Sequence, residues 1–169
     1  MTGSDWPPSY PPPADAPRPL RGRVLDALLD EGLDPDVDDD GDVSYRLRGQ
    51  QLFVRCIDAG SGGPSRTRGG APLARVFGQW RLGDSVPAQE LARLRATNEV
   101  TSRFDLVKAS VHDDVLLVVV DLVVHGDPPL RSMLASASTG VLAAVRAWHA
   151  VAGGRLPGGR EEEGGGAAT

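Results

Sequence analysis

An acidic loop is the segment whose residue types and spacing come nearest to a ligand set for a metal ion. The run Asp36–Gly41 alternates carboxylates ahead of a glycine, as the opening of a calcium-binding loop does. Such a loop needs a bidentate glutamate at its twelfth position, which counted from Asp36 is Leu47, and a helix rather than a strand-like segment after it. We therefore interpret Asp36–Asp42 as a solvated turn, in which Asp and Gly are favoured by backbone geometry.

The three histidines and the single cysteine are the other candidates for metal binding or nucleophilic catalysis. His112 and His125 flank one predicted strand, which separates them by roughly 30 Å at about 3.3 Å per residue, so they cannot share a metal within one chain. Together with His149 they are expected to be surface or strand-end histidines. Cys56 lies among apolar residues of another predicted strand, where a free cysteine usually acts as a small hydrophobe. We expect no catalytic residue, no metal and no cofactor.

Asp121 is the charged residue inside the longest apolar run of the chain, Val115–Val124. Burial in such a run would raise the pKa of its carboxyl group, which is a common feature of functional sites. We favour a structural role instead, in which Asp121 reaches an exposed face or pairs with an arginine such as Arg75 or Arg81.

Charge and hydropathy limit the classes of partner. The formal net charge is −5, and an acidic domain without a stripe of Lys and Arg is a poor candidate for nucleic-acid binding. The one basic cluster, Arg66–Arg68, lies in a Gly/Ser-rich segment that we interpret as a solvated loop. No signal peptide is apparent, and Val115–Val124 is too short to span a bilayer as a helix. We expect a cytoplasmic protein with neither a nucleic-acid nor a membrane partner.

Composition divides the 169 residues into one domain and two tails. Residues 1–19 hold half of the prolines, and residues 153–169 are dominated by Gly and Glu. Neither tail can bury enough apolar surface to offset its chain entropy, so we expect both to be disordered and residues 20–152 to fold. Whether the proline-rich tail docks as a polyproline II segment is left open.

Hydrophobic periodicity predicts the elements that position these residues. Helical spacing marks 19–31, 87–101 and 130–152, whereas alternation or short apolar runs mark strands at 42–48, 51–58, 73–82, 104–111 and 115–124. Gly78 inside a strand indicates a bulge or a closely packed neighbour, and Gly140 inside the last helix indicates a tight crossing.

The order helix, three strands, helix, two strands, helix defines the fold class. Short connections favour antiparallel neighbours, so we expect an α+β fold with a single antiparallel sheet and helices packed mainly on one face. The pairing between the two groups of strands, across the second helix, is left open by the sequence.

Several segments together resemble a known family. They are LDALLDEGL at 25–33, SYRLRGQQLFVRC at 44–56, LRATNEVTSRFDLVKASV at 94–111, the run VLLVVVDLVV and the terminal AWHAVAG. In these segments and in the αβββαββα order, residues 20–152 resemble the YbjN family, in particular the actinobacterial group of YbjN-like peptide-binding chaperones, and the related type III secretion chaperones. The resemblance implies a homodimer, peptide binding on sheet or helix surfaces, and no catalytic residues.

We therefore expect a non-enzymatic, chaperone-like module that binds a protein or peptide client along a strand edge or in a groove between sheet and helix. The candidate contacts are the outward residues of the third strand, Arg75, Phe77, Gln79 and Arg81, with exposed positions of the first helix, because aromatic and arginine side chains suit recognition. One alternative is a dimeric structural or regulatory subunit with a single fixed partner. A lesser alternative is a metal-binding module or enzyme that uses Asp36–Asp42.

Overall fold

A computed structural model describes residues 18–58 and 71–153. Within them the helices are α1 (Leu20–Asp30), α2 (Glu90–Arg103) and α3 (Leu130–Ala152), and the strands are β1 (Asp36–Val37), β2 (Val43–Leu47), β3 (Gln50–Ile57), β4 (Leu73–Arg81), β5 (Val107–His112) and β6 (Val115–Val123). The basic cluster Arg66–Arg68 and nearly all of both predicted tails lie outside the described residues. Disorder of the tails therefore stays a prediction.

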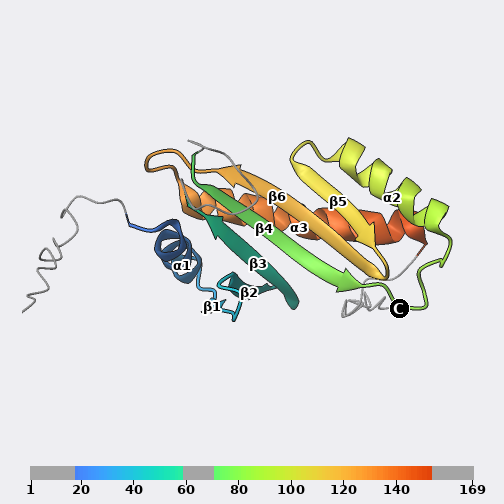
Figure 1. The fold of residues 1–169 in the computed structure, drawn as a ribbon, viewed down its shortest axis with the longest axis horizontal. Coiled ribbons are helices and arrows are strands. Elements are labelled where there is room, and N and C mark those ends of the chain that lie inside the picture. The colour runs from blue at the N-terminus through green and yellow to red at the C-terminus, as the bar shows by residue number, and fades with distance from the viewer. Residues whose placement is uncertain (1–17, 59–70, 154–169) are drawn as a thin grey trace, which may run out of the picture.

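The strands form one antiparallel sheet in the order β1-β2-β3-β4-β6-β5, which confirms the predicted α+β class (Figure 1). The junction that the sequence left open is the long pairing of β4 with β6, in which Arg75 faces Asp121 and Phe77 faces Val119. The two-residue strand β1 was not predicted and extends the sheet beyond β2.

All three helices of the described residues lie on one side of the sheet. α3 runs along the sheet and packs on β4, β5 and β6. α1 packs near the beginning of α3, and α2 packs near its end (Figure 1). The strands are amphipathic because alternate side chains point to opposite faces. Leu52 and Val54 of β3 point toward the helices and are fully buried, whereas Phe53 and Arg55 lie on the opposite face, hereafter the open face.

Trp80 explains the glycine inside β4. A Cβ atom at Gly78 would lie 2.3 Å from Cη2 of Trp80, so only glycine leaves room for this indole, which extends from the same face of β4 two residues further on. β4 pairs with β6 without interruption from Leu73 to Arg81, and Gly78 faces Val118 in this pairing, which makes the closely packed neighbour, rather than a bulge, the reason for Gly78. The indole Nε1 of Trp80 donates to Oε1 of Gln50 at 2.8 Å, so its buried polar atom is satisfied.

α3 is the central element of the core. Its buried side chains recur along one face and include Leu134, Val141, Val145 and Trp148. Trp148 Nε1 donates to Oγ1 of Thr97 at 3.0 Å, which ties the end of α3 to α2. Across the described residues, no helix has the length and apolar character needed to cross a membrane.

Candidate peptide-binding surfaces

β4 places the four predicted contact residues on the open face. Arg75, Phe77, Gln79 and Arg81 are alternate residues of one strand and therefore share a side of the sheet. Gln79 and Arg81 are exposed and Arg75 is half-buried, but Phe77 retains only 7 % of its accessible surface. The structure thus brings the four residues into one row and leaves the last two most accessible.

Phe77 is covered by its neighbours on the open face. Its ring stacks on that of Phe53, with centroids 5.3 Å apart and planes inclined by 22°, and the Arg55 guanidinium carbon lies 5.7 Å from the Phe77 centroid. Two hydrogen bonds fix that guanidinium, from Nε to Oδ1 of Asp42 at 3.0 Å and from Nη2 to Oδ2 at 2.6 Å. A partner could stack on Phe77 only after displacing Arg55 from Asp42.

Arg75 is likewise engaged. Its Nε and Nη2 atoms donate to the two carboxylate oxygens of Asp121 at 2.7 and 3.2 Å, and Lys108 Nζ donates to the same carboxylate at 2.9 Å. The hydrogen bond from Arg75 holds the pKa of Asp121 below its usual value despite partial burial. The prediction that Asp121 pairs with an arginine in a structural role is therefore confirmed, and that arginine is Arg75.

The acidic loop is organised by its own backbone. Oδ1 of Asp38 accepts the N–H groups of Asp40 at 3.1 Å and Asp42 at 2.9 Å, and the Asp42 carboxylate is bound by Arg55. These bonds are those of a side-chain-capped turn, as predicted for the middle of the segment. The prediction of a solvated turn over all of Asp36–Asp42 is wrong at its two ends, because Asp36–Val37 form β1 and Asp42 is only 4 % exposed. Across residues 18–58 and 71–153, no three His, Cys, Asp or Glu side chains gather closely enough to hold a metal ion.

Histidine placement is partly as expected. His112 and His125 are exposed at opposite ends of β6, but His149 is 2 % exposed on α3, so the expectation of a surface histidine is wrong there. His149 Nδ1 bonds to the Val145 carbonyl oxygen at 2.8 Å, while Nε2 is buried with no partner in the described part of the chain. Burial lowers the pKa of His149, which keeps the ring neutral.

Cys56 is half-buried at the end of β3, toward the helices. Burial raises the pKa of its thiol to about 11, so the thiolate is scarce at neutral pH. This agrees with the prediction of a small buried hydrophobe rather than a nucleophile.

A groove opens where the sheet meets the first half of α3; we call it the α3–β5 groove. It has a volume of about 550 Å³ and is lined by residues of the α2–β5 connection, the two strands and the helix: Phe104, Asp105, Leu106, Val107, Val120, Leu122, Ser132, Met133, Ser136, Ala137 and Gly140. Leu106 is 72 % exposed at its rim, more than any other large hydrophobic residue of the described part of the chain.

α3 lacks a side chain at Gly140, where it passes β5 and lines the groove. A Cβ atom at Gly140 would lie 4.0 Å from Cγ2 of Val107, an ordinary contact distance, and nothing else would lie within that range. The predicted tight crossing at Gly140 is therefore wrong: the glycine borders space. The sequence pattern marks Gly140, although for a different reason, and gives no signal at Leu106.

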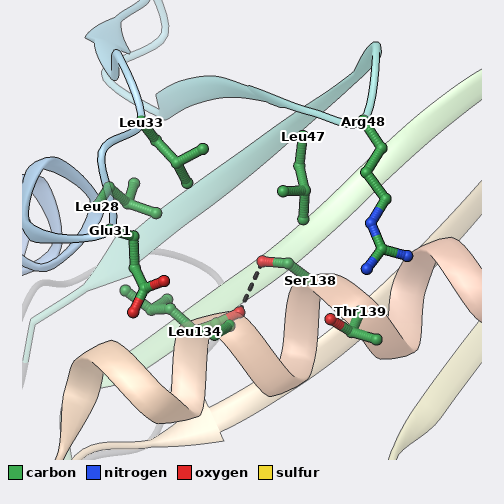
Figure 2. Close-up of a pocket in the computed structure, with 9 residues that line it drawn as sticks. Leu28, Glu31, Leu33, Leu47, Arg48, Leu134, Ser138 and Thr139 are labelled. Atoms are coloured by element: carbon green, nitrogen blue, oxygen red, sulfur yellow. Dashed lines mark hydrogen bonds between the residues drawn. The ribbon is translucent and has the colours of Figure 1, made fainter.

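A second and smaller hollow, the α1–α3 pocket, lies between α1, the β2–β3 turn and α3 (Figure 2). Its volume is about 200 Å³, and its lining consists of Leu28, Glu31, Leu33, Leu47, Arg48, Leu134, Ala135, Ser138 and Thr139. Ser138 Oγ donates to the Leu134 carbonyl oxygen at 2.6 Å, so the Tyr45 hydroxyl, 2.6 Å away, donates to Ser138. Burial raises the pKa of Tyr45 to about 12, which keeps this donor protonated.

The resemblance to the YbjN family stays a prediction after comparison with known proteins. No protein-family model matches the chain, and no curated protein matches its sequence.

Proposed function

We propose that the protein is a non-enzymatic, cytoplasmic, chaperone-like module that binds an apolar segment of a client polypeptide in the α3–β5 groove. The observation that carries the proposal is the groove itself, whose volume of about 550 Å³ lies within the range of ligand sites, roughly 300–1,000 Å³. Its walls are mostly apolar, and an apolar surface left open in a folded chain favours association.

The groove suits an extended segment with alternate apolar side chains. Apolar contact is offered by Leu122 of β6, Met133 of α3 and the exposed Leu106 of the α2–β5 connection. Methionine adapts its shape to different neighbours, which favours binding of more than one sequence. Ser132 and Ser136 add hydroxyl groups on the helix side, where a client backbone needs polar partners.

The open face is the weaker candidate for the same role. Its aromatic residue Phe77 is held under Arg55, and Arg75 is held by Asp121. Binding there would first break charge-assisted hydrogen bonds, which contribute about 1.5–3 kcal/mol each. The exposed Gln79 and Arg81 remain proposed peripheral contacts.

Filling the groove tests the proposal. Gly140→Leu places a side chain in the gap beside Val107, and Gly140→Ala serves as the matched control because its Cβ meets only ordinary contact. We expect short peptides with alternate leucines to bind the wild type and Gly140→Ala alike, and to bind Gly140→Leu at least about tenfold more weakly, a loss of about 1.4 kcal/mol. Fluorescence anisotropy with labelled peptides measures the affinities. Equal affinity for all three proteins would remove the groove from the proposal.

A homodimer or a fixed partner is favoured by a different observation. Leu91 and Leu94 of α2 are 60 % and 50 % exposed, and their spacing places them on one side of the helix. We propose that this side of α2 contacts a second protein chain. In sedimentation equilibrium, Leu91→Lys with Leu94→Lys is expected to halve the mass if that chain is a second copy, whereas Leu29→Lys, at a position 56 % exposed on α1, leaves it unchanged. A monomeric wild type that captures one stoichiometric protein would support the fixed partner instead.

A further inference from the structure

The β2–β3 turn holds an arginine in a backbone conformation that arginine disfavours. Leu47 pairs with Gln50, so Arg48 and Gly49 form a two-residue turn, with φ values of 51° and 75°. Positive φ at both positions is the geometry that Asn-Gly sequences adopt most readily, because a larger side chain crowds its own backbone there. A residue kept in this region against its preference points to a role for its side chain.

That side chain overhangs the α1–α3 pocket. Figure 2 shows Arg48 descending from the turn toward α3, whose Thr139 also lines the pocket. None of the ion pairs or hydrogen bonds among the described residues engages Arg48, whereas Arg55 and Arg75 on the neighbouring strands are both bound by carboxylates. Arg48 therefore has its full set of donors available at the mouth of the pocket.

The other charge at the pocket is already neutralised. Glu31 accepts a hydrogen bond from Nε of Arg131, and the two form an ion pair. The remaining lining is made of four leucines, namely Leu28, Leu33, Leu47 and Leu134, with Ala135 and the hydroxyls of Ser138 and Thr139. The pocket thus combines apolar walls with one uncompensated positive charge at its rim.

The size of the pocket limits what it holds. At about 30 Å³ for each water molecule in the liquid, a volume of about 200 Å³ corresponds to roughly seven waters. A carboxylate on a short branched aliphatic chain fits both this volume and the chemistry of the walls. The carboxylate would take a bidentate pair of hydrogen bonds from Arg48, and the chain would contact the leucines.

We infer that the α1–α3 pocket is a binding site for a short aliphatic monocarboxylate, which is bound through Arg48. The acid is either a free small molecule or the C-terminal residue of a polypeptide, since both present the same group. The site does not depend on the α3–β5 groove, because α1 and the β2–β3 turn line only this pocket.

Titration calorimetry with 4-methylpentanoate tests the inference, with neutral 4-methylpentan-1-ol as the matched probe. We expect saturable binding of the acid and at least tenfold weaker binding of the alcohol, as expected for loss of a charge-assisted pair. Arg48→Asn should weaken binding by a similar factor while raising the melting temperature, because asparagine suits the turn. Arg46→Asn, an exposed arginine that does not line the pocket, should leave binding unchanged.

A second variant is needed because Arg48→Asn could weaken binding by changing the conformation of the turn rather than by removing the charge. Ala135→Leu fills the pocket from α3 without changing its charge, and it should also abolish binding of the acid. Absence of saturable binding to the wild type, or wild-type affinity in both Arg48→Asn and Ala135→Leu, would overturn the inference. Competition by a leucine-terminated peptide with a free carboxylate, but not by its amide, identifies the polypeptide as the source. Failure of both peptides to compete identifies the free acid.

Discussion

Several charged residues of the open face are bound to one another and are therefore not free to contact a partner. Asp121 joins Arg75 to Lys108 from the neighbouring strands β4 and β5, and Asp42 fixes Arg55 above Phe77. Each carboxylate has at least two hydrogen bonds to cations, so removal of either would leave a half-buried guanidinium without its partner.

Asp121→Asn should lower the free energy of unfolding by about 1–3 kcal/mol at neutral pH, because a charged acceptor of three hydrogen bonds is lost. Urea denaturation measures the difference, and Asp39→Asn in the exposed loop is the control. Since the pKa of Asp121 is lowered from 3.8 in the folded state, its contribution is complete above that pH and declines as pH falls below it. A variant as stable as the wild type would show that the ion pair is not significant for stability.

Buried His149 predicts an acid-sensitive fold. Its pKa lies below the ordinary 6.5 because of burial, so the unfolded chain takes up a proton more readily than the folded one. Stability should therefore decrease as pH falls through and below 6.5. We expect His149→Leu to reduce this decrease and His125→Leu, at an exposed position, to preserve it, as followed by urea midpoints between about pH 7.5 and 5. Parallel pH profiles for wild type and His149→Leu would contradict the assignment.

For single residues, the sequence predicted the ion pair of Asp121 but not how far Phe77 and His149 are buried. The pairing of Asp121 with an arginine followed from a single charge inside an apolar strand. The burial of Phe77 did not, because it depends on Phe53 and Arg55 in a strand whose register was unknown. The burial of His149 was also missed, since imidazole is found both inside proteins and on their surfaces.

The elements offer a direct comparison of two glycines. Gly78 in β4 is in contact with the indole of Trp80, whereas Gly140 in α3 borders the α3–β5 groove. The same substitution should therefore have opposite effects in the strand and in the helix.

Gly78→Ala is expected to destabilise the protein by about 1–3 kcal/mol, because the new methyl group forces Trp80 from its position. Gly140→Ala should stabilise it by about 1 kcal/mol, the difference in helix propensity. Thermal unfolding followed by circular dichroism compares the two variants with the wild type. Equal signs for the two changes would contradict the packing described for one of them.

The bounds of a helix could be predicted where its hydrophobic periodicity extends over many residues. They could not be predicted where that periodicity is short. The prediction of α3 over 130–152 is confirmed, but α2 begins at Glu90 rather than residue 87. A turn closed by the Val86 N–H and the Gly83 carbonyl, at 3.0 Å, lies directly before the residue at which the helix was expected to begin. The pairing of β4 with β6 could not be predicted from the sequence, because both β5 and β6 have an apolar pattern that suits a neighbour of β4.

The whole described part of the chain shares one hydrophobic core. The same cluster of buried residues contains Leu28 of α1, Val100 of α2 and Trp148 of α3 together with the helix-facing side of the sheet. The groove and the pocket lie at the margins of this core, where α3 meets elements from opposite ends of the chain. A ligand in either hollow would therefore contact buried side chains of the core, such as Leu134 or Ala137, as well as exposed ones at the rim, such as Arg48 or Leu106.

A continuous core predicts a single cooperative unfolding transition. In a Trp6→Phe background, fluorescence reports on Trp80 and Trp148, which lie in β4 and α3. We expect their transition in urea to coincide with that of the circular dichroism signal, as for other single domains of this size. Two separated midpoints would show that α3 and the sheet unfold as independent units.

The pairing of β4 with β6 also has a consequence for synthesis of the protein on the ribosome. β4 ends at Arg81, but its second neighbour begins only at Val115, after α2 and β5 have been translated. At roughly 5–20 residues per second, the emerging chain spends seconds with one edge of its future central strand unpaired. Exposed strand edges promote aggregation, so we expect the chain to be most prone to aggregation at this stage of its synthesis.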